Sequence, residues 1–135
     1  FFEDDIAQAT ADAGMRAVCG QSVMKYPAPD ASSFEVSLGM AREFADDGIA
    51  VNSLWPRTTI ATAAIEFNFP AEMLRASRKP AIVADAAYHI LTRPSRNCSG
   101  HFFIDEEVLA DAGVTDFEQY AVTPGASLHG DLFLD

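Results

Sequence analysis

The stretch Asp47–Thr62 reads Asp-Gly-Ile-Ala-Val-Asn-Ser-Leu-Trp-Pro-Arg-Thr-Thr-Ile-Ala-Thr and contains a helix end, a strand and a loop. Gly48 follows a helical pattern and suits the left-handed conformation that ends helices. Ile49–Trp55 is short, apolar and partly β-branched, which predicts a buried strand, and Pro56 prevents that strand from continuing. Ligands of open α/β sheets bind just beyond such strand ends. The polar loop after Trp55 is therefore a candidate binding site.

Helical patterns lie on both sides of this strand and loop. Ser32-Ser-Phe-Glu35 is a capping box, in which Ser32 accepts N–H groups of the first turn while Glu35 reaches back. Thr115-Asp-Phe-Glu118 repeats that pattern before a short helix. Pro70 divides the apolar stretch that follows the loop, so we expect short helices there. The other helical regions, predicted from apolar residues at helical spacing, are 4–13, 32–47 and 80–92.

Two further segments predict strands beside Ile49–Trp55. Arg16–Val23 is a run of small and β-branched residues, and His101–Ile104 is apolar and continuous, as in a buried parallel strand. Helices that connect parallel strands form right-handed crossovers. We therefore expect an α/β domain with a partial doubly wound, Rossmann-like fold, in which helices cover a small parallel sheet.

The composition narrows the class of protein. The chain has 135 residues, a formal net charge of −11 and a sequence pI near 4.4, which argues against nucleic acid or an anionic membrane surface as a partner. No apolar run approaches the ~20 residues of a membrane span. Cys19 and Cys98 lack metal-type spacing and predict free thiols in a reducing compartment. Without the basic start of a signal peptide, a cytoplasmic protein is expected.

The strand and its loop resemble the short-chain dehydrogenase/reductase family. Val51, Asn52 and Pro56 match a late strand of that family, which reads Val-Asn-x-x-x-Pro-Gly. Arg57 stands where most of the family has Gly, as in the hydroxysteroid-dehydrogenase-like branch. The resemblance covers roughly residues 38–135, the carboxyl-terminal part of that fold. It continues through Arg78-Lys-Pro80, Ala84-Asp-Ala-Ala-Tyr88, Leu91-Thr-Arg-Pro-Ser95, Ser99-Gly-His-Phe-Phe-Ile-Asp105 and Gly113-Val-Thr-Asp-Phe117.

This resemblance implies a cofactor and a set of residues that contact it. The cofactor would be NAD or NADP, and Pro56, Ile60 and Thr62 would lie on its nicotinamide side, with Asn52 in a structural position. Normal cofactor affinity also needs a glycine-rich turn that lets the backbone approach the pyrophosphate. The glycines of this sequence do not form the Gly-x-x-x-Gly-x-Gly turn, so binding of normal strength is not expected.

The opening residues resemble a different family. Ala11-Asp-Ala-Gly-Met-Arg-Ala-Val18 and Pro27-Ala-Pro-Asp-Ala31 are similar to a helix, strand and loop of the amidohydrolase deaminases, which are metal-dependent (β/α)8 barrels. This segment contains no His and therefore lacks the paired His ligands of that family. We predict two segments, an amidohydrolase-like 1–37 and a dehydrogenase-like 38–135, joined by fusion or by misassembly.

Tyr26 is the only candidate for the family's catalytic Tyr, and it is a weak one. In the family, a Tyr-x-x-x-Lys pair shares one helix face, and the Lys lowers the pKa of the phenol. Tyr26 falls at the Tyr position, but Asp30 stands in place of the Lys, and Pro27 and Pro29 exclude a shared helix. We therefore predict no catalytic residue in this chain.

Other groups able to perform chemistry lack a matching partner. His89, His101 and His129 share no spacing that would suggest a metal site. The run Asp105-Glu-Glu107 after a predicted strand suggests either paired carboxylates for acid/base chemistry or an acidic start to a helix, which the helix dipole favours. Both interpretations of the acidic run remain open.

The sequence thus predicts a short-chain dehydrogenase/reductase-like fragment, related to NAD(P)-dependent oxidoreductases of hydroxyl or keto substrates but catalytically incomplete. The alternative is a non-enzymatic interaction module, and the least favoured interpretation is an amidohydrolase-like hydrolase. A partial sheet leaves an unpaired edge, which favours association. The expected partner is a second copy of the chain, bound through the sheet edge or the apolar tail Leu128–Asp135.

Overall fold

A computed structural model describes residues 8–9, 12–14 and 32–131 of the chain. The predicted strand Arg16–Val23, Tyr26 and most of the segment 1–37 lie outside these ranges. The chain divides into two compact units, Phe1–Asn52 with Arg93–His101, and Ser53–Thr92 with Phe102–Asp135. Among the helices in the described ranges, none has the length and apolar character that crossing a bilayer requires.

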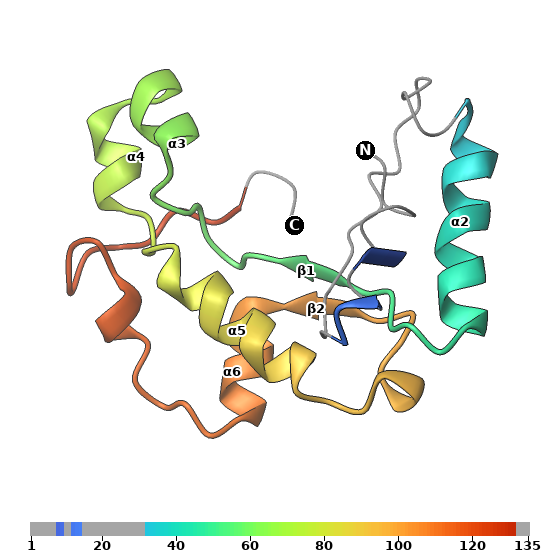
Figure 1. Ribbon diagram of the computed structural model, residues 1–135. Coiled ribbons are helices and arrows are strands. Elements are labelled where there is room, and N and C mark those ends of the chain that lie inside the picture. Colours follow the sequence, from blue (N-terminus) through green and yellow to red (C-terminus); the bar gives the residue numbers. More distant parts are fainter. Residues whose placement is uncertain (1–7, 10–11, 15–31, 132–135) are drawn as a thin grey trace. The chain divides into compact units, whose positions relative to one another are not determined.

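The first unit contains helix α2, Phe34–Asp46 (Figure 1). The Ser33 hydroxyl accepts the N–H of Val36 at 3.4 Å, so the cap is Ser33 and the predicted Ser32 cap is wrong by one residue. Gly48 has a φ of 84°, and the N–H of Ile49 donates to the carbonyl of Phe44 at 2.9 Å. This is the left-handed helix end that the sequence predicted.

The backbone after Gly48 is held by polar groups of the segment 98–101. The Asn52 side chain donates to the Cys98 carbonyl at 2.7 Å and accepts the His101 N–H at 3.0 Å. The Val51 N–H donates to the Ser99 hydroxyl at 3.1 Å. Because side chains satisfy these groups, a regular strand begins only at Ser53, and the predicted strand Ile49–Trp55 is too long at its start. The short 3-10 helix η1, Ser95–Asn97, precedes this segment.

The second unit is built on two parallel strands, β1 (Ser53–Trp55) and β2 (Phe102–Ile104). Trp55 pairs with Ile104, and the Trp55 ring stacks on Phe102 with centroids 6.3 Å apart. Figure 1 shows the two strands side by side near the middle of the unit. The predicted parallel pairing is confirmed, although the second strand begins one residue later than expected.

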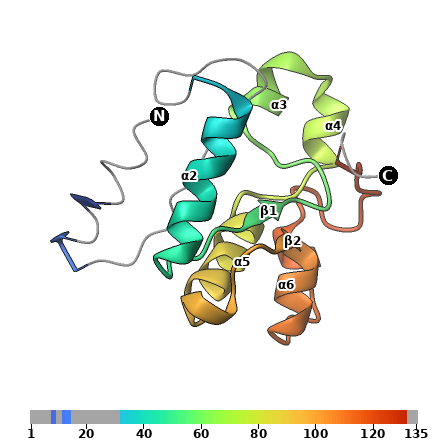
Figure 2. The same ribbon diagram turned by 90° about the vertical axis from the view of Figure 1, so that its right-hand side faces the viewer.

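Two helices pack together and form the core of this unit. Helix α5, Ala81–Leu91, follows the connection after β1, and helix α6, Asp105–Asp111, follows β2 directly. Figures 1 and 2 show α5 beside α6. The predicted helix over 80–92 is confirmed, with its buried residues four positions apart on one face. The core of the two helices consists of Ile82, Ala86, Ile90, Val108 and Leu109.

Shorter helices occupy the rest of the second unit. Pro70 separates α3, Ala63–Asn68, from α4, Ala71–Arg75, as the sequence predicted. The 3-10 helix η2, Glu118–Tyr120, lies where the second capping box was expected. The predicted Thr115 cap is wrong, because the N-cap position is Phe117 and the Asp116 carboxylate accepts the Glu118 N–H at 2.9 Å.

Candidate functional site

The loop that leaves β1 is held between two other segments by backbone hydrogen bonds. The Thr59 N–H donates to the His129 carbonyl at 3.0 Å, and the Arg78 N–H donates to the Thr59 carbonyl at 2.9 Å. The Ala61 N–H donates to the Arg78 carbonyl at 2.8 Å. The loop therefore has strand-like pairing on both sides, which gives it one defined path.

Buried hydroxyls add to this attachment. The hydroxyls of Thr59 and Ser77 lie 2.8 Å apart, and the Ser77 hydroxyl also lies 2.6 Å from the Met73 carbonyl. Thr59 and Ser77 are both buried. Since a buried hydroxyl is costly unless it is hydrogen-bonded, these contacts link the loop firmly to the end of α4.

The three residues predicted to contact a cofactor all lie on this loop. Pro56 and Ile60 are half-buried, and Thr62 is exposed at the position that precedes α3. The Thr62 N–H donates to the Ile60 carbonyl at 2.7 Å, which turns the chain into the helix. Thr62 is the N-cap residue of α3, but its hydroxyl makes no capping hydrogen bond to that helix.

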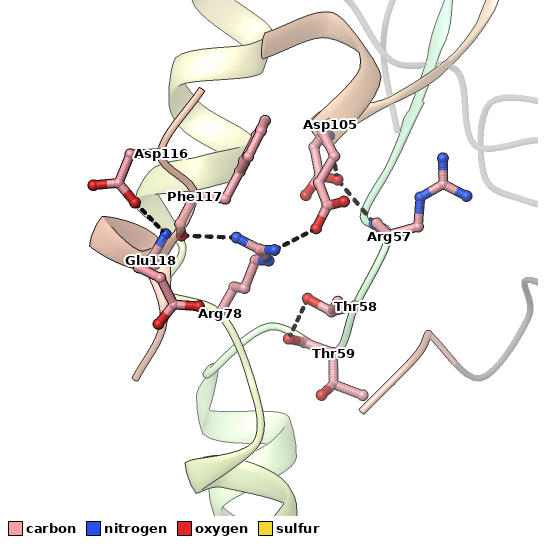
Figure 3. Close-up of polar contacts among 9 residues, drawn as sticks. Arg57, Thr58, Thr59, Arg78, Asp105, Asp116, Phe117 and Glu118 are labelled. Carbon is pink, nitrogen blue, oxygen red and sulfur yellow. Dashed lines mark hydrogen bonds and ion pairs between the residues drawn. The ribbon is translucent and has the colours of Figure 1, made fainter. Parts of the chain in front are cut away.

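The first residue of α6, Asp105, joins this loop to the helix. One oxygen of its carboxylate, Oδ1, accepts the N–H of Arg57 at 2.9 Å and the N–H of Glu106 at 2.7 Å (Figure 3). The residue is fully buried, and its Oδ2 has no hydrogen-bond partner within the described part of the chain. A buried carboxylate with two N–H donors is a strong and directional contact.

Arg78 lies beside Asp105 and connects three segments. Its guanidinium pairs with the Glu106 carboxylate at 2.6 Å and donates to the Phe117 carbonyl at 2.8 Å (Figure 3). It also lies over the Phe117 ring, 5.4 Å from the centroid. Arg78 is only 7% exposed, and its Nε has no hydrogen-bond partner among the residues in 32–131. Its removal would leave the partly buried Glu106 carboxylate and Phe117 carbonyl without this partner.

The acidic run Asp105-Glu-Glu107 thus has structural partners. Asp105 accepts the backbone N–H of Arg57, Glu106 pairs with Arg78, and Glu107 pairs with the exposed side chain of Arg57. All three acids lie in the first turn of α6, as the helix interpretation predicted. Sequence reasoning missed the two arginines as their partners. The only sequence signal for these pairs was that Arg57 and Arg78 each stand in a segment that approaches this turn.

Two ionisable groups in this unit have shifted pKa values. Burial raises the pKa of Asp105, although its two N–H donors and the charges of Arg78 and Arg57 oppose the shift. Burial and the Asp85 carboxylate raise the pKa of Tyr120 to about 12. The Tyr120 hydroxyl donates to Asp85 at 2.7 Å, so it is a structural link to α5 and a poor proton donor to a substrate.

The raised pKa of Asp105 predicts a pH-dependent stability. The folded protein holds the Asp105 proton more tightly than the unfolded chain, so this group favours folding below about pH 4 and loses that contribution as pH rises through its folded pKa. Wild type should therefore lose stability relative to Asp105→Asn as pH rises from about 4. Urea unfolding of both proteins across this range measures the difference, and a pH-independent difference would contradict the assignment.

The other predicted groups do not form a site in the described ranges. His89 lies on α5, His101 precedes β2, and His129 pairs by its backbone with the β1 loop. Within residues 8–9, 12–14 and 32–131, no three His, Cys, Asp or Glu side chains are grouped so that they could hold a metal ion. Tyr26 lies outside these ranges. Its predicted weakness as a catalytic residue stays a prediction.

Curated relatives of this chain carry one common name. This chain is 51% identical over 98 residues to hydroxysteroid dehydrogenase-like protein 2 of Rattus norvegicus. The match covers 73% of this chain and 18% of the relative. It is 43% identical over 117 residues to the Homo sapiens protein of that name, and this match covers 87% of this chain and 26% of the relative. The chain thus spans about a quarter or less of these proteins. No protein-family profile matches it.

The length of the human match bears on the two predicted segments. Residues 38–135 number 98, so a match of 117 residues also includes part of the opening segment. The division after residue 37 and the amidohydrolase-like origin of the first segment stay predictions.

Solved structures agree with the curated relatives. A protein assigned as a dehydrogenase from Xanthomonas campestris is 51% identical with a TM-score of 0.66, over 75% of this chain and 37% of that one. A short-chain dehydrogenase from Mycobacterium thermoresistibile is 45% identical with a TM-score of 0.62, over 76% and 37%. The chain therefore carries part of a short-chain dehydrogenase/reductase domain of the hydroxysteroid-dehydrogenase-like branch.

Proposed function

We propose that residues 38–135 supply the nicotinamide side of the cofactor site in an NAD- or NADP-dependent oxidoreductase of hydroxyl or keto substrates. The observation that carries this proposal is the loop Pro56–Thr62. It leaves the carboxyl end of a parallel strand, where ligands of α/β folds bind, and it is fixed by backbone hydrogen bonds on both sides. Dehydrogenases at 51% identity support the same conclusion.

The residues on this loop fit a contact with one end of a dinucleotide. Thr62 is exposed and its hydroxyl is not used to cap α3, while Pro56 and Ile60 offer half-buried apolar surface beside it. A hydroxyl beside apolar surface suits an amide-bearing aromatic ring, because such sites are mostly apolar with a few placed polar groups. The phosphate-binding turn and the catalytic pair would have to come from residues other than these.

We also propose three properties of the chain as a whole. The chain by itself is catalytically incomplete, it is located in the cytoplasm, and it associates with a second copy through the sheet edge or the tail Leu128–Asp135. The non-enzymatic interaction module has less support, because the similar proteins carry dehydrogenase names.

Titration of the purified chain with NADH and with NADPH tests the proposal. Without a phosphate-binding turn, we expect a Kd of about 1 mM, with amide NMR shifts concentrated between Pro56 and Thr62. Thr62→Ala should weaken binding about fivefold, because it removes one hydrogen bond. The matched control is Thr123→Ala, another exposed threonine, which should bind like wild type.

Two results would contradict this proposal. One is a chain that melts cooperatively but shows no binding up to about 10 mM of either cofactor. The other is a set of shifted amides that lies away from the loop. Light scattering on the same samples would show whether the binding species is a single chain or a dimer.

A further inference from the structure

We infer that Asp105 is a positioning residue for the loop Pro56–Thr62, acting through the backbone N–H of Arg57. This inference rests on the proposed function, because it assigns the residue that sets the path of the proposed cofactor loop. Asp105 itself is fully buried and lies on α6, so it would act without touching the cofactor.

The register of the two strands places the start of α6 beside the end of β1. Trp55 pairs with Ile104 in the parallel ladder, so the next backbone groups of β1 would continue along β2. They cannot do so, because Pro56 has no N–H and α6 begins at Asp105. The first N–H after the ladder is that of Arg57, and the Asp105 carboxylate accepts it at 2.9 Å. A side chain therefore replaces the strand backbone as the acceptor.

The Asp105 carboxylate that makes this contact is itself held in place. The same oxygen accepts the N–H of Glu106 at 2.7 Å, which fixes the carboxylate against its own helix. Arg78 and the Arg57 side chain supply the positive charges that oppose the cost of burying it, and each is paired with a glutamate of the same turn. The fixed carboxylate thus sets where Arg57 lies, and with it the direction in which the loop leaves β1 (Figure 3).

The carbonyl of Arg57 is anchored from the other side, because it accepts the N–H of Asp131 at 3.1 Å. The next backbone contact is that of Thr59 with His129 and with Arg78. Asp105 therefore holds the N–H of Arg57, at the end of the strand, against α6, while the segment 129–131 holds the carbonyl side of the loop. If the contact with Asp105 is lost, the strand and the pairing with 129–131 can persist while the Arg57 amide gains freedom.

Amide hydrogen exchange on the full chain tests the inference directly. Asp105→Ala removes the acceptor, and the Arg57 amide should exchange at least about thirtyfold faster than in wild type. Asp105→Asn keeps a weaker, uncharged acceptor, and the same amide should exchange about threefold faster. The amides of Ile82 and Ala86 in α5 should keep their protection in both variants. The matched controls are Asp111→Ala and Asp111→Asn at the exposed end of α6.

The NADH affinity should follow the same order, with Asp105→Ala the weakest binder and Asp105→Asn between it and wild type. Unchanged exchange at Arg57 in Asp105→Asn would overturn the inference, even if Asp105→Ala does not fold. Exchange that speeds equally throughout α5 and the loop would also overturn it, because that pattern means general destabilisation. If wild type binds no cofactor, the proposed function fails, but the exchange result still decides the role of Asp105.

Discussion

Replacing Arg78 with Ala is expected to lower the free energy of unfolding by about 3 kcal/mol. The guanidinium is nearly buried and satisfies both the Glu106 carboxylate and the Phe117 carbonyl. Its removal leaves a partly buried negative charge beside Asp105, whose Oδ2 has no hydrogen-bond partner among residues 32–131. Breaking a buried pair on one side costs more than the pair itself contributes, because the remaining charge stays desolvated.

A second arginine on the same unit provides the matched control. Arg75 pairs with Glu72 at 2.7 Å, but both side chains are more than half exposed. Arg75→Ala should therefore cost about 0.5 kcal/mol or less. Urea unfolding followed by circular dichroism measures both variants. A loss below about 1 kcal/mol for Arg78→Ala would show that the acidic turn does not depend on this arginine.

A double variant separates the charge from the packing. If an unpaired Glu106 causes the loss, then Arg78→Met combined with Glu106→Leu should recover part of the stability lost in Arg78→Met alone. If the loss of stability comes instead from the hydrogen bond to Phe117 and the contact with its ring, the double variant should be no more stable than Arg78→Met.

Replacing Leu109 with Ala is also expected to cost about 3 kcal/mol. Leu109 is fully buried on α6, the helix that packs against α5. Its truncation loses the transfer free energy of the missing carbons and leaves a cavity in the contact between the two helices. Because α6 also carries Asp105, this variant loosens the scaffold of the loop without changing the polar contacts.

The control for this change is Leu91 at the end of α5, which is 38% exposed. Leu91→Ala should cost about 1 kcal/mol or less, since less apolar surface returns to water. Equal losses for the two variants in urea unfolding would mean that the core of this unit does not lie between α5 and α6.

Local signals in the sequence were sufficient for most elements of the fold. Apolar residues at helical spacing predicted α5, Pro70 predicted the break between α3 and α4, and Gly48 predicted the end of α2. The first capping box was displaced by one residue, because two adjacent serines could each cap and only the backbone geometry distinguishes Ser33 from Ser32. The strand before Pro56 was predicted too long, since the N–H of Val51 bonds to the side chain of Ser99 far along the chain.

The candidate site was predicted only in part. The loop Pro56–Thr62 and its place at the end of a parallel strand followed from the sequence and from the family resemblance. The residues that hold the loop did not, because Arg57 and Asp105 are 48 positions apart and no local pattern links them. Thr59 and Ser77 are likewise 18 positions apart.

The sequence by itself therefore determined most of the helices, the parallel strand pair and the family, because these depend on spacing, on proline and glycine, and on local motifs. The tertiary structure alone decided which acid of the run Asp105-Glu-Glu107 meets which arginine. It also decided that the Asp105 carboxylate replaces a strand backbone as the acceptor for Arg57. These pairings arise only when the ends of β1 and β2 are brought side by side, since hydrogen bonds and burial act over a few ångströms in space and not along the chain.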